Sequence, residues 1–478
     1  MKKIIFTAFL LFAISLPSFA IEEIQIKKGD KLLLSDCIKI AIKNSPVIKK
    51  AEQNYNISKK NVNIAKSDYF PTFGANLGYQ EMINSDRDYD DGSRKNHAPM
   101  IGVYMNQLIY NFGKTSSLIQ MQKFYQISAK YRYLDSICET INNVKLKYCE
   151  VLQAQAAVMA EQENVLISEK MLKMTKKFYD EKKKSEIDYI NAKVYLSAAK
   201  MSLEEANNRY IQTYTDLCNA MYIADAPDFD IQRIDTFDYY DAFFSPSFLE
   251  TPKGYWHEIT NRPREKDKGM GEVQELPFSI EEAYDSAFKN SPDIHAMDSV
   301  ISAMEKSVIN IKRQFYPSLK VRAGYDYDHE YKSSIKHKYS NNQFNVLLTL
   351  NASINGMQYK NSLDKAKLLV ETTKNDREQL RQDIYFNVKR YYYDVKSAEK
   401  QISISKEKVL RALDNLEATR KSYIAGKSDY LEFQTARQNF NTAKIDHIMK
   451  VYYYNVSLAK LERITHKHIE EVWKFANL

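Results

Sequence analysis

Few residues in this chain have the types and spacing that catalysis or metal binding needs. The eight histidines are scattered, and only His466 and His468 lie close together. On a helix, residues two positions apart point about 200° away from each other, which makes a poor pair of metal ligands. A solvated terminal helix explains this pair better. We therefore expect no metal site, no cofactor and no enzymatic activity.

An acidic run before Gly92 superficially resembles a calcium loop; its members are Asp86, Asp88, Asp90 and Asp91. An EF-hand loop needs glycine at its sixth position and glutamate at its twelfth. Here the glycine is one place late and the glutamate is missing. The run is interpreted as part of a polar loop outside a membrane.

The four cysteines do not form a dense disulfide framework: Cys37, Cys138, Cys149 and Cys218. If Cys138 and Cys149 share one helix, they stand about 16 Å apart and cannot bond to each other. Buried thiols are the expectation, and a disulfide between helices stays open.

The first 20 residues read as a secretory signal peptide. Lys2 and Lys3 precede an apolar stretch at 4–16, and Ser18-Phe19-Ala20 has the small-x-small pattern of a cleavage site. The formal net charge of +8 comes from 69 basic and 61 acidic residues, which are interspersed. Nucleic-acid binding normally needs clustered basic residues, so we expect no nucleic-acid partner.

The chain contains its own sequence twice. KNSP occurs at 43–46 and again at 289–292, and YFP at 69–71 aligns with FYP at 315–317, both at an offset of 246 residues. This period is far longer than that of a solenoid repeat, about 20–50 residues. We expect one structural repeat at 21–225, a second at 278–478, and a linker at 226–277.

Long helices are expected in the second part of each repeat. The 113 residues from Lys114 to Ala226 contain neither glycine nor proline, and after Gly356 the only such residue is Gly426. Apolar residues recur there at three-four spacing, as in coiled coils. Each stretch is expected to reverse once, at 179–188 and at 423–432, giving antiparallel arms of roughly 40–60 residues each.

Two β-hairpins are expected between the helices, at about 72–109 and 318–353. Apolar and polar residues alternate there with a period of two. The apolar set is Phe73, Ala75, Leu77, Tyr79, Ile101, Val103, Met105, Leu319, Val321, Ala323, Tyr325, Tyr327, Phe344, Val346, Leu348 and Leu350. Such strands suit a transmembrane barrel, whose strands are apolar outside and polar inside. Four strands are too few to close one, so either the sheet packs on a soluble core or several chains share a barrel. The duplication, the export signal and the long helices favour the shared barrel.

The order of these motifs resembles the TolC-like outer-membrane efflux family along nearly the whole mature sequence. The matching segments are 34–46, 69–72 and 106–113, together with Tyr423, Gly426, Asp429 and Glu432. The resemblance implies a mainly α fold with a small β part. Each chain would contribute four transmembrane strands, and a long antiparallel coiled-coil α-helical barrel would extend from the end of these strands. Three chains would form a homotrimer with a shared 12-stranded barrel in the outer membrane of a Gram-negative bacterium, and the helices would extend into the periplasm.

The same resemblance points to residues at the helix tips. The resemblance implies a periplasmic gate that contains Tyr423, Glu432 and Thr435. Counting from the turn residue Tyr423, the family's acidic pore constriction falls on Glu432 and Thr435, and Thr435 departs from the acidic pattern. Tyr423 would tie the tip closed by hydrogen bonding. The tip turns, which would contact an adaptor, contain Lys182, Ser185, Gly426 and Asp429.

The expected function is that of a passive exit duct in a tripartite efflux or type I secretion system. Its partners would be a periplasmic adaptor (membrane fusion) protein, an inner-membrane pump of the RND, ABC or MFS type, and outer-membrane lipid. The alternative is a soluble periplasmic coiled-coil scaffold or adaptor without a pore. The substrate, whether drug, metal ion or polypeptide, stays open.

Overall fold

The computed structural model describes residues 29, 31–84, 94–224, 229–231, 276, 278–332, 337–352 and 355–466. The signal peptide, the acidic run before Gly92, most of the linker at 226–277 and His468 lie outside the described residues. Within the described part, no helix has an apolar stretch long enough to cross a membrane.

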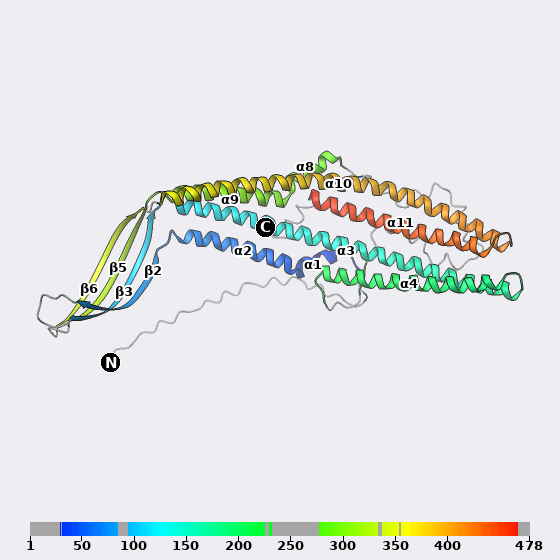
Figure 1. Ribbon diagram of the computed structural model, residues 1–478, viewed down its shortest axis with the longest axis horizontal. Helices are drawn as coiled ribbons and strands as arrows, with labels where there is room; N and C mark the ends of the chain where they lie inside the picture. The colour runs from blue at the N-terminus through cyan, green and yellow to red at the C-terminus, as the bar shows by residue number, and fades with distance from the viewer. Residues whose placement is uncertain are drawn as a thin grey trace.

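The molecule is a long rod with a curved sheet at one end and two helical turns at the other (Figure 1). The first half contains β1 (Lys31–Leu32), α1 (Leu34–Asn44), α2 (Pro46–Ser67), β2 (Thr72–Asn84), β3 (Arg94–Tyr110), α3 (Lys114–Asp180) and α4 (Glu186–Ala220). After β4 (Asp230–Ile231), the second half contains α8 (Ile280–Asn290), α9 (Pro292–Arg313), β5 (Ser318–Lys332), β6 (His337–Asn351), α10 (Gly356–Ile424) and α11 (Tyr430–Thr465). The two halves repeat one order of elements, and the predicted mainly α class is confirmed.

The repeated KNSP sequence has the same local structure in both halves. Ser45 caps α2 by accepting a hydrogen bond from the backbone N–H of Ile48 at 3.3 Å. Ser291 caps α9 in the same way, with the N–H of Ile294 at 3.4 Å. The proline after each serine occupies the first helical position, where its missing N–H costs nothing. These residues therefore set the start of the short helix that leads to each hairpin.

The helical arms have very unequal lengths, so the prediction of 40–60 residues for each arm is wrong. α3 has 67 residues and α10 has 69, whereas α4 has 35 and α11 has 36. At 1.5 Å per residue, each long helix spans about 100 Å. The long helices continue past the shorter arms because α2 and α9 pack along their remaining length.

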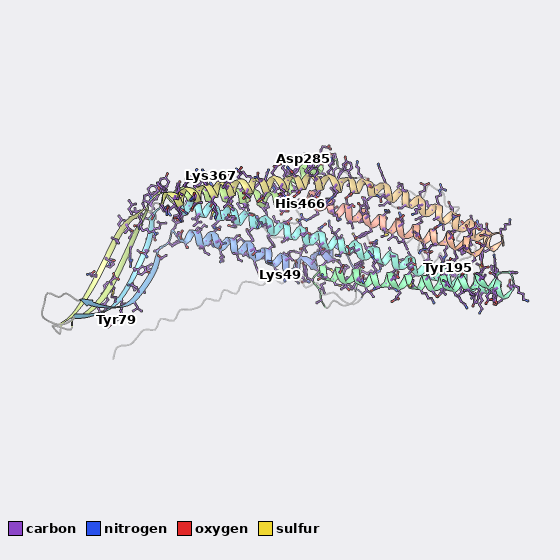
Figure 2. The ribbon with its side chains drawn as sticks, viewed as in Figure 1. Lys49, Tyr79, Tyr195, Asp285, Lys367 and His466 are labelled. Carbon is purple, nitrogen blue, oxygen red and sulfur yellow. The ribbon has the colours of Figure 1, made fainter. Side chains whose placement is uncertain are left out.

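The four strands β2, β3, β5 and β6 form one antiparallel sheet in that order, and the β3–β5 pairing joins the two halves. The register aligns Ala75 with Val103, Val103 with Tyr325, and Tyr325 with Phe344. Directly paired residues share a face, so the predicted apolar set lies on one face across all four strands. Most of its large side chains are exposed in the single chain, Tyr79 among them (Figure 2).

The main hydrophobic core lies at the middle of the rod, where α1, α3, α4, α10 and α11 meet. Tyr148 of α3 is buried there, and its hydroxyl donates a hydrogen bond to the carbonyl of Leu32 at 3.2 Å. β1 and β4 form a small parallel pair beside it. The start of the linker is thereby attached to the core.

The four cysteines are free thiols, and three of them are buried. Burial raises the pKa of Cys37 and Cys149 to about 12 and that of Cys138 to about 11. A thiol attacks as its thiolate, so these groups are unreactive.

His466 is buried rather than solvated, which corrects the interpretation given for the terminal histidines. It ends α11 in a left-handed conformation with φ 48°. Burial, reinforced by the nearby charge of Arg463, lowers its pKa to about 3. The imidazole is therefore neutral at physiological pH.

Candidate functional site

The predicted tip residues gather at the end of the rod opposite the sheet. α3 reverses into α4 through residues 181–185, and α10 reverses into α11 through 425–429. Both turns have one residue in the left-handed conformation, Gly426 with φ 72° and Lys182 with φ 58°. Both also have the same backbone hydrogen bond closing the helix: Lys427 to Ser422 at 2.9 Å, and Lys183 to Phe178 at 2.8 Å. The first turn therefore keeps the Schellman geometry although lysine replaces the usual glycine.

The returning helices begin with side-chain caps at equivalent positions. Asp429 accepts a hydrogen bond from the backbone N–H of Glu432 at 2.7 Å. Ser185 accepts one from Asp188 at 3.2 Å. Both caps satisfy an otherwise unpaired N–H in the first helical turn. Ser185 and Asp429, with Lys182 and Gly426, are exposed at the tip.

Glu432 and Thr435 are exposed one turn apart at the start of α11. The Glu432 carboxylate accepts a hydrogen bond from the Ser428 hydroxyl at 2.6 Å and makes no ion pair with the described residues. The Thr435 hydroxyl donates to the Leu431 carbonyl at 2.9 Å. In the single chain, the Glu432 carboxylate therefore presents its negative charge to solvent.

Tyr423 does not share this exposure, because it is completely buried within the chain. Its ring stacks on Phe433 with centroids 5.6 Å apart. The Lys184 ammonium lies 4.5 Å from the ring centroid and donates to the Ser428 carbonyl at 3.4 Å. Lys184 belongs to the first turn and Ser428 to the second, so these contacts hold the two turns together.

The Tyr423 hydroxyl is enclosed without a well-formed hydrogen bond to the described residues, and so is the hydroxyl of Thr175. Burial raises the pKa of Tyr423, and the neighbouring Thr175 opposes part of that rise. The two hydroxyls lie close enough to interact but do not form a strong hydrogen bond, and a buried hydroxyl without a strong partner is destabilising. The packing around Tyr423 must therefore offset a local cost.

A row of buried polar contacts, which sequence reasoning missed, joins α3 to α11 behind the tip. Lys444 forms an ion pair with Glu163 at 2.5 Å, with only 5% and 8% of the two side chains exposed. Arg437 donates to the Ser168 hydroxyl at 2.7 Å. Positions 437, 441 and 444 follow the three-four spacing of the helix face that packs against the core. Polar residues at that spacing were the sequence signal that could have indicated these buried contacts.

A cavity of about 640 Å³ lies beside this row, between α4 and α11. Arg437 and Asn441 line it from α11, and Glu161 from α3. Tyr195 of α4, near the tip in Figure 2, also lines it. Burial lowers the pKa of Arg437, while Glu161 accepts a hydrogen bond from Asn441 at 3.1 Å. The groove is thus lined by polar and apolar side chains together, with Arg437 and Glu161 among its charged residues.

Comparison with known proteins identifies what this rod is. The sequence model of the family described as "Outer membrane efflux protein" matches residues 37–221 and 283–465, one segment in each half of the chain and together well over half of its length. The chain belongs to the outer membrane efflux protein family. This membership places it among efflux channels of the outer membrane rather than among enzymes. No curated protein sequence matches it.

Solved structures share the fold of this outer membrane efflux protein at low sequence identity. CusC, which forms a transmembrane channel, is 13% identical, with a TM-score of 0.73, covering 90% of this chain and 91% of CusC. The Campylobacter jejuni CmeC outer membrane channel is 14% identical, with a TM-score of 0.69 and coverages of 92% and 89%. The Neisseria gonorrhoeae MtrE outer membrane channel is 16% identical, with a TM-score of 0.66 and coverages of 90% and 88%.

Proposed function

We propose that three copies of this chain close their sheets into one 12-stranded barrel in the outer membrane. The observation that carries the proposal is the apolar face of the sheet, whose large side chains are exposed along all four strands. Soluble monomers rarely expose contiguous apolar patches larger than a few hundred Å². Lipid would cover this face, and the polar face would line the interior. A soluble scaffold would leave the face in water, which disfavours that alternative.

The sheet edges support closure between chains. β2 and β6 each pair with only one of the described strands, so each has a free edge. Unpaired backbone groups cost several kcal/mol each in lipid, and pairing β6 of one copy with β2 of the next removes that cost. Three four-stranded sheets then make a closed barrel of the proposed homotrimer.

The helical part has a second surface that fits a neighbouring copy. Ile187, Ile190, Val194 and Met201 are exposed along α4 at spacings of three, four and seven residues. This spacing forms the apolar seam of a coiled coil. We infer that the seam packs against the next copy, so that the helices form a barrel in the periplasm.

At its tip, the proposed trimer places three Glu432 carboxylates around one axis as a gate. The exposed turns that contain Lys182, Ser185, Gly426 and Asp429 would contact a periplasmic adaptor. Lys184 joins the two helical turns at the tip. Opening of the gate would require both turns to move together when the adaptor binds. Energy would come from an inner-membrane pump, in a tripartite efflux or a type I secretion system.

We expect Glu432→Gln to weaken channel block by hexaamminecobalt(III) about tenfold. Three carboxylates at roughly 0.2–1 kcal/mol each account for a change of that size. The measurement is the block of single-channel current in planar bilayers, with the cation added on the helical side. Glu305→Gln, on α9 in the half of the rod next to the sheet (Figure 1), is the matched control and should leave the block unchanged. Equal block in wild type and Glu432→Gln would remove Glu432 from the gate.

A further inference from the structure

The polar face of the sheet has an ordered arrangement around one tyrosine. The ring of Tyr104 on β3 fills the space that Gly74 leaves open on β2, because a Cβ atom at Gly74 would overlap that ring. The Arg322 guanidinium of β5 lies 4.5 Å from the centre of the same ring. Residues of three adjacent strands thus hold Arg322 in place through a cation–π contact with the Tyr104 ring. This contact involves the face of the guanidinium and leaves its N–H donors available.

Asp326, one of the acidic residues on this face of β5, is held separately and lies farther from the helices than Arg322. Asp326 accepts a hydrogen bond from Asn345 at 2.9 Å, and it lies over Gly102 together with Asn76. Asp326 is four residues from Arg322 on the same strand, so the two backbone positions are about 13 Å apart. Arg322 makes no ion pair with the described residues.

Lys320 adds a second positive charge on the same face, two residues from Arg322 towards the helices. Arg322 is exposed in the single chain. The helical end of the polar face is therefore basic, whereas the tip of the rod presents the Glu432 carboxylate. The proposed conduit therefore carries fixed charges of opposite sign at two separate levels: basic where the sheet meets the helices, and acidic at the tip of the rod.

We propose that Arg322 is a selectivity residue of the barrel, where three copies form a basic ring that binds multivalent anions. This inference rests on the proposed trimeric channel and extends it. The planar guanidinium fork matches phosphate and carboxylate groups with two parallel hydrogen bonds. A ring of fixed charge in a narrow passage concentrates ions of the opposite sign. The ligand class is thus solutes that carry several phosphate or carboxylate groups.

The test is block of single-channel current by inositol hexakisphosphate added on the barrel side. The wild-type channel should be blocked, and Arg322→Gln should weaken the block about tenfold. Arg322→Lys should keep most of it, because the charge remains while the stacking changes. Lys49→Gln, an exposed position of α2 near the middle of the rod (Figure 2), is the control for loss of any positive charge and should not alter the block.

Two results would overturn the assignment of Arg322 in a conducting channel. One is a block equal in wild type and Arg322→Gln. The other is a block lost equally in Arg322→Lys and Arg322→Gln, which would show that Arg322 acts through packing rather than charge. A wild-type chain that forms no conducting pore would overturn the proposed function, and this inference with it.

Discussion

Lys444→Met is expected to destabilise the folded chain by about 3–5 kcal/mol. The ion pair between Lys444 and Glu163 is almost completely buried. Removing the lysine leaves a carboxylate in the interior without its counter-charge, and this uncompensated charge is the source of the cost. The measurement is the free energy of unfolding from guanidinium titrations followed by circular dichroism.

A double variant separates the cost of leaving the Glu163 charge unpaired from the net contribution of the ion pair. Lys444→Met combined with Glu163→Leu removes both charges and should recover most of the lost stability, because two apolar side chains can pack in the same space. The exposed pair Lys408–Asp446 is the matched control, since its side chains are 55% and 36% exposed. Lys408→Met should cost less than about 1 kcal/mol. A Lys444→Met variant as stable as Lys408→Met would contradict the structural role given to the buried pair.

Val346→Arg is expected to disfavour membrane assembly by up to about 2–4 kcal/mol, the cost that a cation on the lipid face of a barrel reaches at the membrane midplane. Val346 lies on the apolar face, where it pairs with Ala323, and 62% of its side chain is exposed in the single chain. The measurement is the yield of detergent-extracted trimer after expression at matched levels.

Leu347→Arg is the control for this substitution. Leu347 is the next residue on β6, 54% exposed, and it pairs with Arg322 on the polar face. An arginine there would point into the aqueous interior, where its repulsion from Arg322 should cost at most about 1 kcal/mol. Trimer yield should therefore fall far less than in Val346→Arg. If Leu347→Arg were the damaging variant and Val346→Arg the tolerated one, the lipid and interior faces would be reversed.

The sequence predicted the parts of this fold that depend on local patterns. The alternation of apolar and polar residues predicted which face of the sheet each strand residue occupies. The strand register confirms this, because apolar residues pair with apolar residues across the sheet. The Ser-Pro pairs that start α2 and α9 were a further local signal, but they were interpreted only as evidence of the repeat. The absence of glycine and proline indicated the long helices.

Features that depend on contacts between distant residues were not predictable in this way. The helical arms differ in length because α2 and α9 pack along the parts of the long helices that α4 and α11 do not reach. The pairing of Lys444 with Glu163 joins residues 281 positions apart, and nothing in either local sequence marks the partner. Tyr423 was expected near a gate, and its complete burial gives it a packing role within the single chain. The roles of Glu432 and Thr435 in a pore stay predictions.

The most direct test of the shared barrel is the location and mass of the mature protein. The measurement is membrane fractionation followed by light scattering in detergent, with the bound detergent subtracted. We expect a protein of the outer membrane whose mass is three times that of one mature chain. A water-soluble monomer or dimer would contradict it.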